Sequence, residues 1–255
     1  MEERFTARML IDWYMEQQGL TVEALGVAPV VVLSWSRRVV ESLAEAAGAQ
    51  PSQHWLYGEQ YPLYRGEVAG DPVSFAQMPV GAPGTVMIME EMIACGARVF
   101  LGLGLTGSLQ PEAPIGTLLI PTSCIREEGT SAHYLDLEVT VGPSERLVRL
   151  LLKACKEEGL KVLAGPHWTT DAPYRELVSK IEAFREQGVL GVDMETSAMY
   201  ALGQVRGVEV CNLLVVSDEL WHEWRLAFGS PELREAMKGA ERVVLRALAA
   251  DILGR

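Results

Sequence analysis

Two acidic residues stand where a carboxylate could do chemistry. Glu195 lies directly after Met194, at the predicted junction of a loop and a helix, and one carboxylate there can accept hydrogen bonds from two neighbouring hydroxyl groups. Asp218 follows an apolar segment, residues 210–216, that predicts a buried strand, where a carboxylate is costly unless it is paired or functional. Each also has a structural interpretation, as a helix-start glutamate or a turn aspartate. The residue types alone leave both interpretations open.

A glycine-rich segment, residues 102–107, has the sequence Gly-Leu-Gly-Leu-Thr-Gly and matches the G-x-G-x-x-G pattern of dinucleotide-binding proteins. That pattern requires a helix to begin at once, so that its amide end meets a pyrophosphate. Pro111 and Pro114 exclude a regular helix in the segment that follows. We therefore reject a nicotinamide cofactor and expect a tight turn after a buried strand. Such a turn either lets a ligand approach backbone amides or only relieves crowding.

Composition narrows the class of protein. The chain has 255 residues, 49% of them apolar, which suits one large α/β domain or two small ones. Its net charge of −12 disfavours nucleic-acid and anionic membrane partners. The first four residues lack the pattern of a secretory signal, and no apolar stretch reaches the ~20 residues that span a bilayer. Four widely spaced cysteines predict buried free thiols in a reducing cytoplasm, and neither zinc ligands nor disulfides.

Short β-branched segments alternate with longer amphipathic ones, which predicts strands and helices in turn. Expected strands cover residues 30–33, 73–78, 98–103, 117–121, 161–164 and 209–216. Expected helices cover residues 37–47, 83–95, 144–158 and 175–187, then begin near Met194 and again at Pro231, which Ser230 caps. The pattern predicts one α/β domain over residues 1–255. We expect a mixed, mostly parallel twisted sheet flanked by helices on both faces, with ligands bound at the carboxyl ends of the strands.

Four segments occur in an order and spacing that carry a family resemblance. They are residues 81–84 (Gly-Ala-Pro-Gly), 104–109 (Gly-Leu-Thr-Gly-Ser-Leu), 191–198 (Gly-Val-Asp-Met-Glu-Thr-Ser-Ala) and 215–218 (Val-Val-Ser-Asp). Together they resemble the nucleoside phosphorylase family, which includes purine nucleoside phosphorylases, uridine phosphorylases and related nucleosidases. Residues 126–134 and 168–176 are similar to its uridine-phosphorylase-like branch. The resemblance covers residues 28–250, and the Met-Glu segment is its most specific part.

The resemblance implies roles for the two acidic residues. Met194 and Glu195 would hold the ribose, with the carboxylate on the hydroxyl pair of the sugar. Asp218 would be a general acid that protonates the departing base, and an arginine, Arg234 or Arg225, would assist it. The uridine enzymes usually lack an aspartate at this position, so Asp218 favours a purine.

The resemblance also implies a phosphate site. Arg38, in the segment after the first strand, would hold the anion together with Thr106 and Gly107 of the glycine turn. The family has a second arginine where this chain has Gly102, and a hydroxyl residue where it has Leu105. Because losing a bidentate guanidinium is not a conservative change, water is an alternative nucleophile.

The base is expected to stack on Trp168, for which a buried structural tryptophan is the alternative. The predicted activity is phosphorolysis of the N-glycosidic bond of a purine or pyrimidine nucleoside, giving a pentose 1-phosphate and a free base, as in nucleoside salvage. No metal or cofactor is expected beyond phosphate as co-substrate. A nucleosidase that uses water, or a catalytically silent nucleoside-binding protein, are the alternatives. The resemblance further implies a homo-oligomer, either a dimer or a hexamer.

Overall fold

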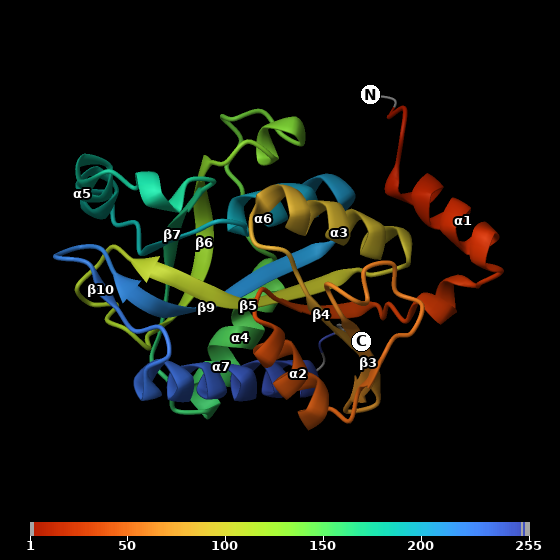
Figure 1. The fold of residues 1–255 in the computed structure, drawn as a ribbon. Helices are drawn as coiled ribbons and strands as arrows, with labels where there is room; N and C mark the ends of the chain where they lie inside the picture. The colour runs from red at the N-terminus through yellow and green to blue at the C-terminus, as the bar shows by residue number, and fades with distance from the viewer. Residues whose placement is uncertain (1–2, 251, 253–255) are drawn as a thin grey trace.

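One ten-stranded sheet organises the chain in the computed structural model, which describes residues 3–250 and 252 (Figure 1). Met1 and Glu2, part of the segment tested for a signal pattern, lie outside the described residues. The strands are β1 (Val30–Ser34), β2 (Gln50–Pro51), β3 (Leu63–Val68), β4 (Asp71–Gln77), β5 (Val99–Ser108), β6 (Leu118–Glu127), β7 (Val162–Thr170), β8 (Gly191–Asp193), β9 (Glu209–Glu219) and β10 (Arg225–Leu226). Their order is β10-β9-β6-β7-β8-β5-β1-β4-β3-β2.

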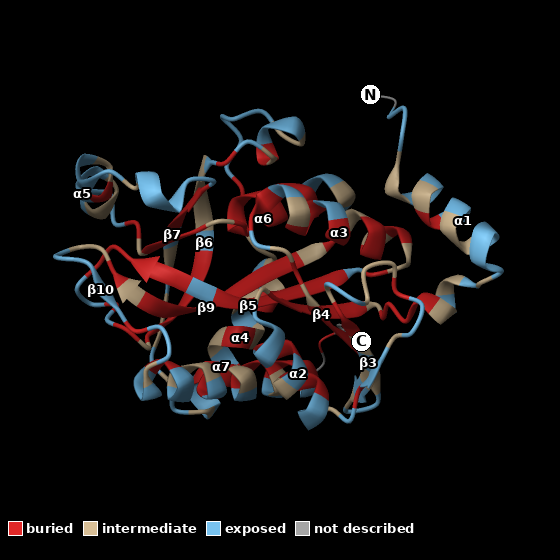
Figure 2. Ribbon diagram, viewed as in Figure 1, coloured by how far each residue is buried: buried red, intermediate tan, exposed pale blue. Residues whose placement is uncertain are grey.

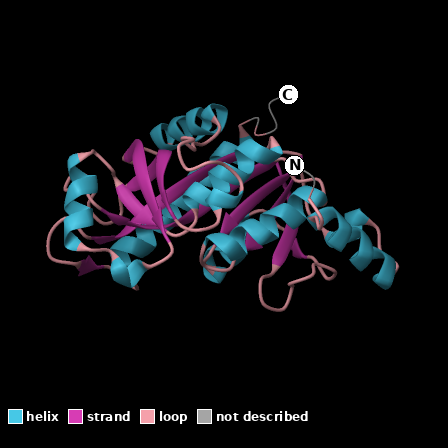
Figure 3. Ribbon diagram, turned by 90° about the horizontal axis from the view of Figure 1, so that it is seen from above, coloured by secondary structure: helices cyan, strands magenta, loops and turns pink. Residues whose placement is uncertain are grey.

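Helices cover both faces of this sheet (Figures 1 and 3). They are α1 (Ala7–Gln18), α2 (Arg37–Ala46), α3 (Ala82–Ala94), α4 (Glu145–Glu157), α5 (Val178–Glu186), α6 (Thr196–Arg206) and α7 (Pro231–Ala249), with short 3-10 helices η1 (Val22–Leu25), η2 (Ser131–His133) and η3 (Pro173–Arg175). Helices α2, α4 and α7 pack on one face, and α3 and α6 pack on the other. α1 lies outside α3, and α5 covers the end of the sheet near β7 and β10.

Five of the strands close into a ring, because β5 pairs with both β8 and β9. The circuit continues from β9 to β6, from β6 to β7 and from β7 to β8. The two longest pairings, β5 with β9 and β6 with β7, are parallel, whereas β5 with β8 and β6 with β9 are antiparallel. The sheet is therefore mixed, and its closed part brings the ends of β5, β8 and β9 to one place.

Burial explains why the central strands form where they do. Every residue of β1 is buried, as expected of a parallel strand covered on both faces (Figure 2). One apolar cluster fills the space under α2, α4 and α7, and a second lies under α3 and α6. Ser230 accepts a hydrogen bond of 3.1 Å from the backbone N–H of Leu233, which confirms the predicted cap of α7. No described helix has the length and apolar composition that a membrane crossing needs.

The predicted α/β fold is confirmed, and one local expectation is wrong. The glycine segment is not a turn, because β5 runs without interruption from Val99 to Ser108. The strands expected at residues 117–121 and 161–164 are also longer than predicted. Glycines at positions 102, 104 and 107 let side chains from outside β5 pack closely against this strand.

Candidate functional site

Gly107 marks the place where the two acidic segments meet. Its Cα is in register with Val192 of β8 on one side and with Asp218 of β9 on the other. Neighbouring strands lie about 4.8 Å apart, so the backbones at Val192 and Asp218 are at most about 10 Å from each other. Glu195 follows Val192 by three residues, and both acidic side chains therefore belong to one end of the strand ring.

Glu195 is only 7% exposed and lies immediately before α6. Its Oε1 accepts a hydrogen bond of 2.6 Å from the backbone N–H of Gly81, which begins α3 with a φ of 100°. Burial and the nearby carboxylate of Asp193 raise the pKa of Glu195 to about 8, although the Gly81 hydrogen bond acts in the opposite direction. Met194, half-buried, lies beside it at the end of β8.

A buried network beneath Glu195 holds this junction in place. Asp193 accepts hydrogen bonds from the hydroxyl and backbone N–H of Thr196 and from Oγ1 of Thr169, the last at 2.8 Å. Asn212 donates from Nδ2 to Oγ1 of Thr196 at 2.7 Å. These hydrogen bonds join the first turn of α6 to β7 and β9. They thereby fix the positions of residues 194 and 195, which lie between β8 and α6.

Glu128, a second buried carboxylate, anchors the loop after β6. It accepts hydrogen bonds from the backbone N–H groups of Thr130 and Ser131 and, at 2.8 Å, from the hydroxyl of Ser197 on α6. Its role is to join that loop to the helix that follows Glu195.

Asp218 is held by two neutral donors. The hydroxyl of Ser217 donates to its Oδ1 at 2.7 Å, and Nε1 of Trp224 donates to its Oδ2 at 3.0 Å. The same Oδ2 lies against Gly107, because a Cβ on that glycine would be 3.4 Å from it. Asp218 therefore faces the end of β5.

Neither arginine considered for Asp218 forms a hydrogen bond or an ion pair with it among the described residues, and the assistance expected of Arg234 or Arg225 stays a prediction. Arg225 pairs with Glu219 at 3.4 Å, its register partner across β9 and β10. Arg234, in the first turn of α7, donates to the backbone carbonyl of Gly229. The partner is Trp224 instead, which sequence analysis missed because an exposed loop tryptophan carries no periodic signal.

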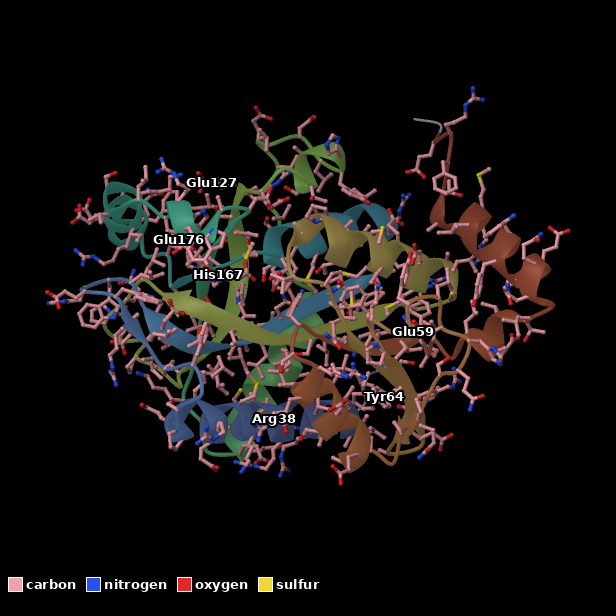
Figure 4. The ribbon with its side chains drawn as sticks, in the orientation of Figure 1. Arg38, Glu59, Tyr64, Glu127, His167 and Glu176 are labelled. Atoms are coloured by element: carbon pink, nitrogen blue, oxygen red, sulfur yellow. The ribbon has the colours of Figure 1, made fainter. Side chains whose placement is uncertain are left out.

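Glu176 is a further acidic residue at this end of the molecule. It follows η3 and is half-buried, and Figure 4 labels it in the same part of the view as His167 of β7. Burial and the charge of Asp218 raise the pKa of Glu176 to about 7. His167, fully buried inside the ring, has its pKa lowered by burial while Asp193 acts in the opposite direction. Sequence analysis could have found Glu176 only by its place after a strand end.

Trp168 does not lie in the site, and its predicted stacking on a base is corrected. Its side chain is fully buried between β7 and α5. Nε1 donates to Glu127 at 2.8 Å, the ring of Phe184 packs edge-on at 5.1 Å, and Lys180 lies over the indole. Successive residues of a strand point to opposite sides, so Trp168 points outward where His167 points inward. The structural alternative therefore holds.

Thr106 and Gly107, the residues of β5 that were expected to bind phosphate, make contacts with the neighbouring strands. The hydroxyl of Thr106, which is buried, donates to the backbone carbonyl of Val192 at 2.8 Å. A Cβ on Gly102 would lie 2.9 Å from Cγ of Asn212, so an asparagine from β9 fills that space. These contacts join β5 to β8 and β9, and Gly107 lies in register with both strands, next to an irregularity in the β5–β9 pairing between Thr106 and Gly107.

Arg38, the third expected phosphate ligand, lies on α2, which covers the face of the sheet opposite to α6, the helix that follows Glu195. It is exposed in the first turn of α2, where its charge acts on Glu241 of α7, and Figure 4 shows it below the sheet. Trp35 stands nearer the strand ends. Its ring would be 2.8 Å from a Cβ on Gly104, and its Nε1 donates to Thr85 of α3 at 2.9 Å.

The described residues offer no group of three His, Cys, Asp or Glu side chains that converge as metal ligands. The four cysteines are free thiols, two of them buried. What the site offers is a set of carboxyl groups around the ends of β5, β8 and β9. Such groups can accept hydrogen bonds from hydroxyls and can hold or deliver a proton.

Comparisons with known proteins show which sequences and structures this chain is similar to. Residues 29–249 match the sequence profile of a family described as the phosphorylase superfamily. A uridine phosphorylase from Treponema pallidum is 31% identical over 173 residues, which are 63% of this chain and 66% of that protein. A guanosine phosphorylase from Halorubrum lacusprofundi is 23% identical over 205 residues, covering 80% of this chain and 84% of that protein.

Two solved structures share the fold. A purine nucleoside phosphorylase from Toxoplasma gondii in complex with immucillin-H superposes with a TM-score of 0.83 at 24% identity, covering 92% of this chain and 95% of the other. A uridine phosphorylase from Vibrio fischeri, complexed with 6-hydroxy-1-naphthoic acid, superposes with a TM-score of 0.77 at 21% identity, covering 91% and 93%.

Proposed function

The chain belongs to the phosphorylase superfamily, and from that premise we propose that it cleaves the N-glycosidic bond of a purine or pyrimidine nucleoside, with phosphate as the acceptor. The products would be a pentose 1-phosphate and a free base. One observation carries the proposal: Val192 and Asp218 are both register partners of Gly107. The segment that leads to Glu195 and the carboxylate of Asp218 therefore lie at the same end of the strand ring.

In the proposed mechanism, Glu195 accepts hydrogen bonds from the hydroxyl pair of the ribose, and Met194 packs against the sugar. Because the pKa of Glu195 is raised to about 8 without a ligand, ribose binding is coupled to loss of its proton: hydrogen bonds from hydroxyls favour the charged carboxylate, and such charge-assisted bonds are stronger than neutral ones. The bond to the base breaks through an oxocarbenium-like transition state. Asp218 assists the base as it departs by acting as the general acid, because a base that accepts a proton is a better leaving group.

Hydrolysis is a second candidate, favoured by what surrounds Gly102. The side chain of Asn212 fills the space beside this glycine, and Arg38 acts on Glu241. With water as the nucleophile the sugar product would be free ribose. A silent nucleoside-binding protein would keep the ribose site without turnover.

A nucleoside panel separates these activities. The purified chain is incubated with inosine, guanosine, adenosine and uridine, with and without phosphate, and base and sugar products are separated by chromatography. Phosphorolysis predicts base release that depends on phosphate, and hydrolysis predicts release without it. If no base appears in either condition but a nucleoside raises the Tm, the protein binds without catalysis.

Homo-oligomerisation stays a prediction from the resemblance. Sedimentation velocity at two protein concentrations would measure it, and a single species with the mass of one chain would contradict it. In such an oligomer, a neighbouring subunit would be one source of a cationic side chain for binding the phosphate.

A further inference from the structure

Helix α1 and the residue before its N-cap carry three large apolar side chains that the fold leaves uncovered. Phe5 is 68% exposed, Met9 53% and Trp13 57%. Met9 and Trp13 are four positions apart and therefore lie on one face of α1, and Phe5 directly precedes the N-cap, Thr6. We call Phe5, Met9 and Trp13 the α1 patch. Exposed apolar side chains gathered in one place mark an interaction surface.

The helix that carries the α1 patch is fixed to the rest of the molecule. Its inner face packs on α3, where Ile11 is buried against Ala94 (Figure 1). The segment before α1 is held by Arg206 of α6, which lies 2.8 Å from Glu3 and 2.7 Å from Glu90 of α3. The α1 patch therefore has a defined position beside α3 and α6.

The apolar surface extends from α1 onto these two helices. Met87 of α3 and Val205 of α6 are exposed as well, and α3 packs against both α1 and α6. Met87 lies about 10 Å along α3 from Ala94, which packs under α1. A stable interface buries about 800 Å² per partner. Three side chains of roughly 150–250 Å² each fall short of this, so an occupant must also cover the neighbouring helices.

A row of charged residues on α1 indicates which partner fits. Arg8, Asp12 and Glu16 are exposed and run beside the α1 patch, with Arg4 before them. The first half of this row is basic and the second half is acidic, and within one helix Arg8 and Asp12 lie 3.7 Å apart. If two copies of α1 lie antiparallel, the basic half of each faces the acidic half of the other. The surface is thus complementary to itself, as a two-fold contact requires.

The same antiparallel arrangement suits the apolar residues and disfavours other partners. It places Met9 of one copy against Trp13 of the other, and a thioether packs well on an aromatic ring. The net charge of −12 makes two copies repel over most of their surface, whereas α1 offers both signs. Helices that lie on anionic membranes carry a polar face rich in Lys and Arg, which Asp12 and Glu16 contradict.

We propose that α1 is a docking surface for a second copy of this chain. The contact is an antiparallel two-fold pairing in which the α1 patches of two copies cover each other, and Arg8 of each copy meets the acidic half of its partner's helix. Helix α1 precedes residues 29–249, the part of the chain that matches the superfamily. The inference does not depend on the proposed function.

The first test removes the apolar contact. Sedimentation velocity over a series of protein concentrations compares the wild type with Trp13→Glu. The dissociation constant should rise by about 30-fold or more, as for a tryptophan at the centre of an interface. Val178→Glu is the matched control, because Val178 is also an exposed apolar residue of a helix but lies on α5. This control should associate as the wild type does.

A second test uses charge and does not depend on the stability of one variant. Arg8→Glu makes the charged row acidic from residue 8 onward, and the double variant Asp12→Lys, Glu16→Lys makes it basic. Each protein alone should form a smaller species than the wild type, because like charges then meet across the two-fold axis. An equimolar mixture should recover the wild-type mass. Two misfolded proteins would not restore each other in this way.

The remaining outcomes overturn the inference. A wild type that sediments as one chain at every concentration has no such contact. If Trp13→Glu associates as tightly as the wild type, or if the charged variants do not recover on mixing, the copies meet elsewhere. Flotation with phosphatidylserine vesicles covers the alternative occupant: vesicle binding by the wild type that is lost in Trp13→Glu would assign the α1 patch to a membrane surface instead.

Discussion

At the scale of single residues, the backbone N–H of Gly81 determines how Glu195 is presented. That amide belongs to the start of α3, so a hydrogen bond of 2.6 Å orients the carboxyl group before any ligand arrives. Preorganised groups of this kind spare a binding site the cost of ordering them. Met194 and Glu195 therefore owe their position to residues that need not touch a ligand.

Replacing Glu195 tests the proposed ribose contact. Glu195→Gln should lower kcat/KM for a ribonucleoside by about 10–100-fold, because a hydrogen bond to a charged group contributes about 1.5–3 kcal/mol. The loss should be smaller for the matching 2′-deoxynucleoside, which lacks one of the two hydroxyls. Steady-state kinetics with both substrates measure this, and an equal loss on both would argue against the contact.

Trp168 gives a prediction that separates a structural role from a binding role. Trp168→Phe removes the hydrogen bond to Glu127, so the free energy of unfolding should fall by about 1–3 kcal/mol. The KM for nucleosides should stay unchanged, because the indole is fully buried. Urea denaturation and steady-state kinetics measure the two quantities. A raised KM with unchanged stability would restore the stacking role.

The sequence predicted single residues only where a motif carried them. Glu195 and Asp218 could be named because their segments resemble a family pattern. Trp224 and Glu176 could not, because they lie in loops whose path depends on how α5 and β10 pack. Arg38 was named because its segment resembles a family segment that follows the first strand. Whether a side chain at the start of a helix points to the site or to a neighbouring helix is a property of the folded structure.

At the scale of elements, the glycines of β5 reflect tight contact between strands and side chains. Residues 102–107 suggested a turn because glycine is common in turns. They form a strand instead because side chains of Asn212, Trp35 and Leu220 occupy the space that a Cβ would take. Long-range packing of this kind leaves no local signal, and the sequence pattern therefore predicted the start of β5 but not its length.

A double-mutant cycle tests that explanation. Gly102→Ala should lower the free energy of unfolding by about 1–3 kcal/mol, because the new methyl group meets Asn212. In an Asn212→Ala background the same change should cost clearly less, since the crowding is relieved. Chemical denaturation of the four proteins measures the coupling. Equal costs in both backgrounds would mean that Asn212 is not the source of strain.

At the scale of the whole molecule, the raised pKa values predict how stability varies with pH. Glu195 and Glu176 have pKa values of about 8 and about 7 in the folded protein, against 4.5 as the ordinary value. The folded state therefore binds more protons than the unfolded state between these limits. Stability from this source is complete below pH 4.5 and is lost as the pH rises through 7 to 8.

The free energy of unfolding should thus decline between pH 5 and pH 9, by an amount on the order of a few kcal/mol for the two groups together. Urea unfolding at a series of pH values measures the decline. Glu195→Gln and Glu176→Gln should each flatten the curve, because the amide has no proton to lose. A wild-type curve that rises over this interval, or variants with the same slope as the wild type, would contradict the prediction.

The shared register on Gly107 also bears on which nucleosides the protein could accept. The segments that carry Glu195 and Asp218 are both paired with β5 within a closed ring of strands. The distance between the expected sugar contact and the expected base contact therefore cannot change by one strand sliding along another. A bulkier heterocycle would have to be accommodated by residues 171–177, which include η3, and residues 220–230, which include the short strand β10, because both segments lie outside the ring. Changes in the range of accepted substrates would then arise in those two segments, while the paired strands that hold the acidic residues stay the same.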